Sequence, residues 1–155
     1  MLRLNRLMLS CLMTSFYLTQ FASAAFTSVS LTGSLAGATL EHQINLNDSN
    51  ANGQDTITIR YTVPQTGWLA VGVNPTGSGM INGEVIIGKP TDDTVKKYKI
   101  SNKSARAIAE QPNQTLINTS LQQTGGNTVM TFTKLLVEAD EFTITAPVEH
   151  LSPCS

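Results

Sequence analysis

Residues 67–89 read GWLAVGVNPTGSGMINGEVIIGK, and this stretch decides the fold of the chain. Trp68–Val73 is almost entirely apolar and Glu84–Ile87 repeats the pattern, as expected of two strands that are buried on both faces. The loop between them, residues 74–79, is rich in Gly, Pro and Asn and predicts a turn. Met80 therefore ends a Gly-rich loop directly before a core strand, where its thioether is expected to pack or to bind something.

Short strands separated by turn signals recur on both sides of this stretch. Asp55–Val63 alternates most regularly, and its core-facing residues are expected to be Ile57, Ile59, Tyr61 and Val63. Other strands are expected at 26–31, 39–46, 93–100, and in a hairpin of 115–121 with 128–136 across Gly125-Gly126-Asn127. Residues 105–110 fit either a short helix or a strand. The sequence thus predicts an all-β protein, an antiparallel sandwich with no long helix.

The first 24 residues have the form of a signal peptide. Arg3 and Arg6 precede an apolar run, and Ala22-Ser23-Ala24 fits the small-residue cleavage rule. An uncleaved anchor is the alternative, although the run is short and interrupted by polar residues for a membrane span. We therefore expect residues 25–155 to form one domain that is secreted or lies on the extracellular face of the membrane.

Charge and cysteine content limit the classes of partner that the protein is expected to have. Without the first 24 residues, eight basic residues face eleven acidic ones, a formal net charge of −3. No basic face is indicated, so nucleic acid is not expected as a partner. Cys154 would be the one cysteine left, which predicts an intermolecular bond or a missing partner.

Four sequons agree with an extracellular site, although several would arise by chance in a chain so rich in Ser, Thr and Asn. Their acceptor residues are Asn47, Asn102, Asn113 and Asn118.

Together, Gly67-Trp68, Gly72 and Met80-Ile81-Asn82-Gly83-Glu84-Val85-Ile86-Ile87-Gly88 resemble the signature of DOMON domains, the β-sandwich modules of secreted redox proteins. The resemblance runs from about Gly33 to Phe142. It implies a two-sheet, immunoglobulin-like sandwich. Several members resemble electron-transfer cytochrome domains that hold a b-type haem between a Met and a His.

The resemblance places Met80 on the position of the family's Met ligand to haem iron. A thioether opposite an imidazole stabilises ferrous iron, which suits an electron carrier. His150 is the one candidate downstream for the second ligand. It comes early relative to the family pattern and lacks the surroundings that the pattern has there.

That early position leaves two explanations open. The sandwich is C-terminally incomplete and the true polypeptide continues beyond Ser155, or the domain has diverged and binds no haem. A sandwich without its last strands would leave open sheet edges.

Several residues have a plain structural interpretation beside the functional one. Met80 fits core packing as well as iron ligation, and His42, at an inward-facing strand position, fits a hydrogen-bonded core or rim residue better than a metal ligand. Trp68 is expected in the sandwich core, and Glu84 is expected to accept backbone N–H bonds more than to line a pocket. Lys96, Lys97 and Lys99 are expected to form a solvated edge.

Catalysis by this chain alone is not expected. It has two histidines, no Cys-His pair after the signal segment, and neither a nucleophile elbow nor a phosphate loop. Three functions remain open: a haem b electron-transfer module, which we rank first, a haem-free module for a sugar or other small ligand, and a structural domain or the N-terminal fragment of a larger membrane-anchored redox protein. The expected partner is accordingly a redox protein or a small extracellular ligand, and a membrane only if the chain continues beyond Ser155.

Overall fold

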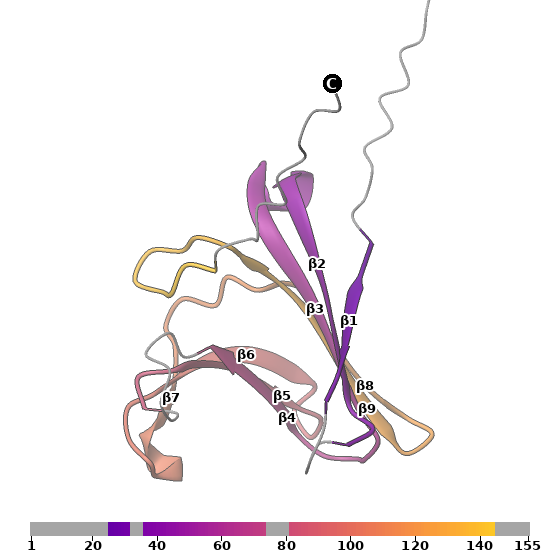
Figure 1. The fold of residues 1–155 in the computed structure, drawn as a ribbon. Coiled ribbons are helices and arrows are strands. Elements are labelled where there is room, and N and C mark those ends of the chain that lie inside the picture. Colours follow the sequence, from indigo (N-terminus) through magenta and orange to yellow (C-terminus); the bar gives the residue numbers. More distant parts are fainter. Residues whose placement is uncertain (1–24, 32–35, 74–80, 145–155) are drawn as a thin grey trace, which may run out of the picture.

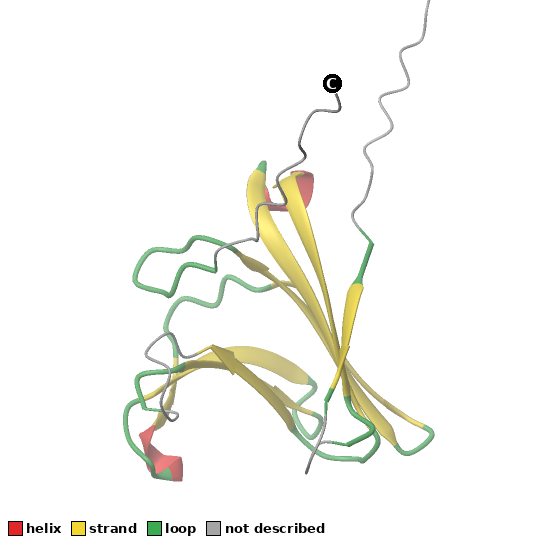
Figure 2. Ribbon diagram, viewed as in Figure 1, coloured by secondary structure: helices red, strands yellow, loops and turns green. Residues whose placement is uncertain are grey.

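A computed structural model describes residues 25–31, 36–73 and 81–144, which form two antiparallel β-sheets (Figures 1 and 2). The five-stranded sheet has the order β1 (Thr27–Ser30), β2 (Thr39–Asp48), β3 (Gln54–Val63), β9 (Asn127–Leu135), β8 (Ile117–Thr124). The four-stranded sheet has the order β4 (Leu69–Val73), β5 (Glu84–Lys89), β6 (Thr94–Ile100), β7 (Ile108–Glu110). The predicted all-β antiparallel sandwich is confirmed.

The central strands of the larger sheet are far apart in the chain. β3 pairs with β9 over its length, with Ile59 opposite Phe132 and Tyr61 opposite Met130. Phe132 and Met130 are fully buried. The regular alternation of residues 55–63 therefore does what the sequence predicts, because it turns one apolar face of β3 toward the other sheet.

The core lies between the two sheets. From the larger sheet it takes Tyr61, Val63, Met130 and Phe132, and from the smaller sheet Leu69 and Ile86. Partly buried residues of both sheets pack around them, among them Val95 of β6. Alternate residues of each strand thus fill the space between the two sheets, as two-layer packing requires.

The stretch that decides the fold forms the pair β4–β5, with Leu69 opposite Gly88 and Val73 opposite Glu84. In β5 the residues from Val85 to Gly88 are all buried, which confirms a strand covered on both faces. β4 is the edge strand of its sheet and is less covered. Gly88 faces the larger sheet, where a Cβ would come within 2.9 Å of both Leu121 and Met130.

The predicted turn between the last two strands is also present. β8 and β9 are joined by Gly125 and Gly126, with φ of 61° and 81°, which matches the left-handed backbone of a two-residue hairpin turn. Residues 105–110, which fitted either a short helix or a strand, contain both: a 3₁₀ turn, η3 (Ala105–Ala107), followed by β7. A second 3₁₀ turn, η2 (Ser49–Ala51), joins β2 to β3. Within the described ranges, no helix is long and apolar enough to cross a membrane.

Candidate functional site: an aromatic groove on the outer face of the four-stranded sheet

The four-stranded sheet carries a second apolar surface on the face turned away from the core, here called the outer face. Because β5 alternates, Ile86 and Gly88 face the core while Val85 and Ile87 lie on the outer face. Tyr98 and Ile100 of β6 join them in one cluster with Ala70. Each of the four larger side chains is less than a tenth exposed. The sheet is therefore apolar on both faces, although only one of them meets the other sheet.

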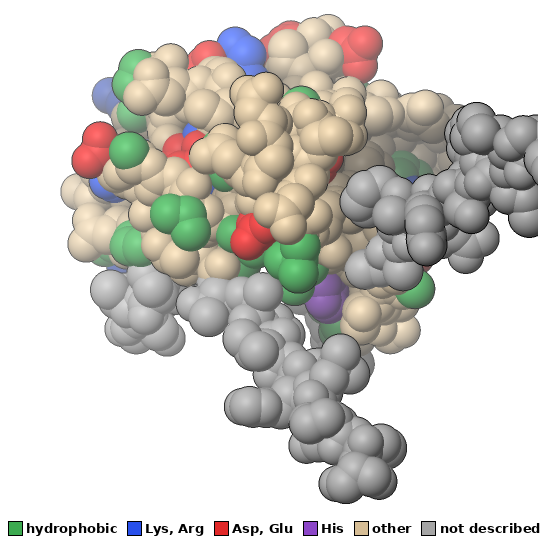
Figure 3. Space-filling model, turned by 90° about the horizontal axis from the view of Figure 1, so that it is seen from above, with side chains coloured by type: hydrophobic (Ala, Val, Ile, Leu, Met, Phe, Trp, Pro, Cys, Tyr) green, Lys and Arg blue, Asp and Glu red, His purple; other side chains and the backbone are tan. Residues whose placement is uncertain are grey.

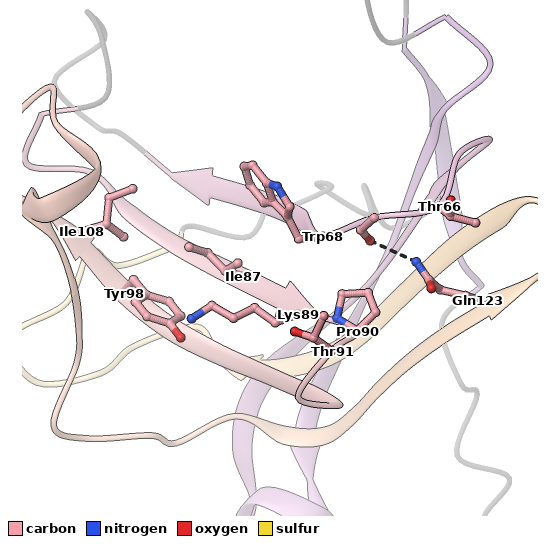
Figure 4. Close-up of a pocket in the computed structure, with 10 residues that line it drawn as sticks. Thr66, Trp68, Ile87, Lys89, Pro90, Thr91, Tyr98, Ile108 and Gln123 are labelled. Atoms are coloured by element: carbon pink, nitrogen blue, oxygen red, sulfur yellow. Dashed lines mark hydrogen bonds between the residues drawn. The ribbon is translucent and has the colours of Figure 1, made fainter.

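A groove of about 730 Å³, here called the Trp68 groove, opens on this outer face (Figure 4). Ile87 and Tyr98 line it together with residues from the start of β4, the end of β5, and β7 and β8; the full set is Thr66, Gly67, Trp68, Ile87, Lys89, Pro90, Thr91, Tyr98, Ile108 and Gln123. Its size lies within the range of small-molecule and cofactor sites. Apolar and aromatic side chains dominate, with a few polar groups at one end.

Trp68 is 67% exposed in this groove, so the prediction that it lies in the sandwich core is wrong. The reason is its place in the alternation, because Leu69 takes the inward position and is buried in the core. Trp68 falls two residues before Ala70 and shares its side of the strand. An exposed indole beside a groove is a common feature of ligand-binding surfaces.

Lys89 is the cation of the groove. Its ammonium nitrogen lies 4.9 Å from the centre of the Tyr98 ring, within the range of a cation–π contact. A hydrogen bond with Tyr98 raises the pKa of Lys89 above its ordinary value, so the lysine is charged at neutral pH. Figure 4 shows the lysine side chain running along the groove toward the Tyr98 ring.

The segment that carries Trp68 is fixed to the larger sheet by hydrogen bonds. The Gln123 amide nitrogen donates to the carbonyl oxygen of Gly67 at 3.3 Å and to the Thr128 hydroxyl at 3.0 Å (Figure 4 shows the first). The Thr128 hydroxyl donates in turn to the carbonyl oxygen of Gln65 at 2.7 Å. β8 and β9 therefore hold the chain on either side of Thr66, at one end of the groove.

The predicted haem ligands Met80 and His150 lie outside the described residues. So do the signal segment 1–24, Cys154 and the loop 74–79. The residues after Met80 are described and are anchored on β6. Asn82 N–H donates to the carbonyl oxygen of Ile100 at 2.7 Å, and Ile100 N–H donates to that of Gly83 at 3.1 Å. Residues 82–83 thus lead into β5 at the end of the strand where Val85 and Ile100 begin the outer-face cluster.

A cluster of buried charges lies near this end of the sandwich, here called the lysine–glutamate cluster: Lys97, Lys134, Glu138 and Glu141. Lys97 of β6 pairs with Glu138 at 2.8 Å and with Glu141, and Lys134 of β9 pairs with Glu138 at 2.5 Å and with Glu141. The prediction that Lys97 is solvated is therefore wrong. Lys97 faces inward opposite Ile86 and meets the chain that follows β9, which Figure 1 shows in yellow.

Burial and hydrogen bonds oppose each other in this cluster. Burial by itself would raise the pKa of Glu138, but hydrogen bonds from Lys134, Lys97 and Thr115 outweigh it and lower that pKa. Burial, followed by the charge of Glu141, raises the pKa of the neighbouring Glu84. Glu84 accepts a hydrogen bond from Phe142 N–H at 3.3 Å and does not line the Trp68 groove. This agrees with the structural interpretation of Glu84, in which its carboxylate accepts a backbone N–H bond. The donor belongs to the chain that follows β9.

The other predicted residues lie apart from the groove. His42 is half-buried on β2, in the larger sheet. Among the described residues, no group of three His, Cys, Asp or Glu side chains could hold a metal ion. The sequon residues Asn47, Asn102, Asn113 and Asn118 are all exposed. Charged side chains are scattered on the face seen in Figure 3, without a broad basic area.

Sequence reasoning missed Lys89, Tyr98, Ile108 and Gln123 as groove residues. Lys89 was recognisable in part, because it follows Val85 and Ile87 at strand spacing and must share their face. Tyr98 stands between two lysines, which hid its apolar role. Gln123 enters from the other sheet, and no local pattern indicates that.

Comparison with known proteins agrees with the resemblance seen in the sequence. A family model described as DOMON domain matches residues 41–147. No solved structure matches the chain.

Proposed function

Because this chain belongs to the DOMON family, we propose that it is a b-type haem-binding module that transfers electrons outside the cell, with the outer face of β4–β7 as its haem surface. It acts as a carrier and not as an enzyme. Its exchange partner is another redox protein. The observation that carries the proposal is an apolar sheet face with a groove of about 730 Å³, whose lining includes the cation Lys89 and no acidic residue.

The described residues fit such a ligand. Haem b is flat and mainly apolar, with two propionate carboxylates on one edge. Ile87 and Tyr98 offer a buried apolar floor, and Trp68 and Ile108 offer further apolar area around it. Lys89 supplies the one cation among the groove-lining residues, and none of those residues is acidic. Burial of apolar area and neutralisation of a carboxylate would thus both favour binding.

The iron ligands in this proposal are Met80 and His150. Haem held by these two residues would supply one-electron chemistry and would leave no open site for oxygen. Met80 would be held by the anchoring of Asn82 and Gly83 on β6, since only a short step of chain separates them. The outer face would exclude water from the macrocycle through Val85, Ile87 and Ile100.

The test is the visible spectrum of the purified protein titrated with haem b, recorded oxidised and after reduction with dithionite. Sharp low-spin bands in the reduced form are expected, and Met80→Ala should abolish them while Ser78→Ala, in the same loop, retains them. His150→Ala is compared with His42→Ala, the other histidine of the chain. A folded protein that binds no haem in either state would contradict the proposal.

A second candidate function is favoured by the exposure of Trp68. An indole that is 67% exposed beside Thr66, Thr91 and Gln123 offers a stacking surface next to hydrogen-bonding groups, which suits a sugar ring or another small extracellular ligand. Trp68 is the only tryptophan, so its fluorescence reports on the groove alone. A rise in melting temperature with glycans, lost in Trp68→Ala, together with no haem spectrum, would replace the first proposal by this one.

A further inference from the structure

We infer that the Trp68 groove recognises a carboxylate on the edge of a flat apolar ligand, and that Lys89, held over Tyr98, is the residue that binds this carboxylate. The inference rests on the proposed function in one respect, because it takes the porphyrin as the ligand. It adds a site that does not involve the iron ligands.

The position of the ammonium group is the first argument. The register of β5 and β6 places Lys89 opposite Thr94, and Tyr98 lies four residues further along β6. At roughly 3.3 Å per residue this is about 13 Å along the strand. The Lys89 ammonium nevertheless lies 4.9 Å from the centre of the Tyr98 ring, so the side chain extends along the outer face of the sheet (Figure 4).

Charge balance on the same sheet is the second argument. Lys96 pairs with Glu110 at 2.8 Å, and Lys97 pairs with Glu138 and Glu141. Lys89 lines the groove, and among the described residues no carboxylate forms an ion pair with it. Asp92 and Glu110 act on it only through their more distant charge. A ligand carboxylate would therefore be its first direct anionic partner.

The groove lining gives the third argument, because it defines what must accompany the carboxylate. Ile87 and Tyr98 are nearly covered, whereas Trp68 is 67% exposed and Ile108 38% exposed. The exposed pair can lose further area to water when a ligand binds, and burial of that area is favourable. The site therefore fits a ligand with a broad flat apolar body and an anionic edge, a description that includes the porphyrin of haem.

Metal-free protoporphyrin IX tests this inference without iron ligation. The full protein is titrated with the diacid and with its dimethyl ester, which has the same macrocycle and no charge, and binding is followed by quenching of Trp68 fluorescence. We expect Lys89→Met to weaken diacid binding by about tenfold, equivalent to about 1.4 kcal/mol, and to leave ester binding unchanged. Lys89→Arg should retain most of the diacid affinity, because it keeps the charge.

Lys99→Met is the matched control, since Lys99 is an exposed lysine of the same sheet that does not line the groove. Circular dichroism and the melting temperature verify that each variant is folded. Equal losses for diacid and ester, or no loss in Lys89→Met, would overturn the inference while haem binding by wild-type protein stands. A protein that binds haem b but not the diacid would also overturn it. Failure of both porphyrin and haem to bind would remove the proposed function as well.

Discussion

Lys97 of β6 and Glu138, which follows β9, form an ion pair of 2.8 Å in which the side chains are 3% and 6% exposed. The pair connects the four-stranded sheet to the chain leaving the five-stranded one. Lys134 and Glu141 complete the lysine–glutamate cluster, so two positive and two negative charges neutralise each other out of contact with water. Such a cluster is stable only while it is complete, because a lone buried charge is costly.

Lys97→Met should lower the free energy of unfolding by about 3–5 kcal/mol, since it leaves Glu138 and Glu141 with one lysine between them. Urea unfolding followed by circular dichroism measures the change. Lys96→Met is the matched control. Its pair with Glu110 is exposed to solvent, so the loss of that pair should change the free energy of unfolding far less than Lys97→Met does. Equal effects in the two variants would show that the buried pair contributes nothing special.

Stability should fall at both ends of the pH range because of this cluster. The pKa of Glu138 is lowered from its ordinary 4.5, so its contribution is present above pH 4.5 and is lost as pH falls through the folded-state pKa. Burial alone would lower the pKa of Lys134, but hydrogen bonds to Glu138 and Glu141 raise it above 10.5. Its contribution is therefore present below pH 10.5 and is lost as pH rises through the folded-state pKa.

Melting temperatures measured from acid to alkaline pH test this expectation. Glu138→Gln should flatten the acid limb and also weaken the alkaline limb, because Glu138 is one of the two carboxylates that raise the pKa of Lys134. Glu84 acts in the opposite sense, because its raised pKa gives stability below pH 4.5 that is lost as pH rises through the folded-state pKa. If the loss of stability at acid pH is unchanged in Glu138→Gln, that loss comes from other carboxylates.

Trp68→Ala should change the free energy of unfolding by less than about 0.5 kcal/mol, although a buried aromatic residue costs about 3–5 kcal/mol on the same substitution. The indole is 67% exposed, so its removal leaves no internal cavity. Phe132→Ala, at a fully buried position of β9, provides the comparison. A large loss of stability in Trp68→Ala would place the indole in the core after all.

Gly88→Ala should destabilise the protein by about 1–3 kcal/mol through overpacking. The new methyl group would lie 2.9 Å from Leu121 and from Met130, between the two sheets. Thermal unfolding of Gly88→Ala, Leu121→Ala and the double variant measures the coupling. The double variant should be more stable than the sum of the single changes predicts, because the shortened Leu121 makes room. Strict additivity would contradict the proposed clash.

The strands were predictable because their information is local. Alternation places β3, and the turn signals around residues 64–67, 89–93 and 125–127 separate the strands correctly. The family signature around Met80 identified the domain, and the sandwich followed from both. Alternation does not show what each face of a strand packs against. A strand that is apolar on both faces has the same sequence pattern whether both faces are packed or one of them lines a groove.

Trp68 and Lys97 show this limit from opposite sides. An apolar residue in an apolar run looks like core, but Trp68 points to the outer face. A lysine with other lysines beside it in the sequence is expected to be solvated, but Lys97 points inward. The carboxylates that neutralise it, Glu138 and Glu141, follow β9 and are therefore distant in the sequence. Both errors concern which side of the sheet a residue takes, which depends on contacts distant in sequence.

The pairing of β3 with β9 also determines when the nascent chain can fold. β3 ends at Val63 and β9 begins at Asn127, so the ribosome must make residues 64–126 before the central strand pair can start to form. During that interval the edge of β3 has no partner from its own sheet except β2. Distant pairing of this kind is slow and leaves strand edges open to other chains. The step most dependent on chaperones should therefore be the arrival of β9.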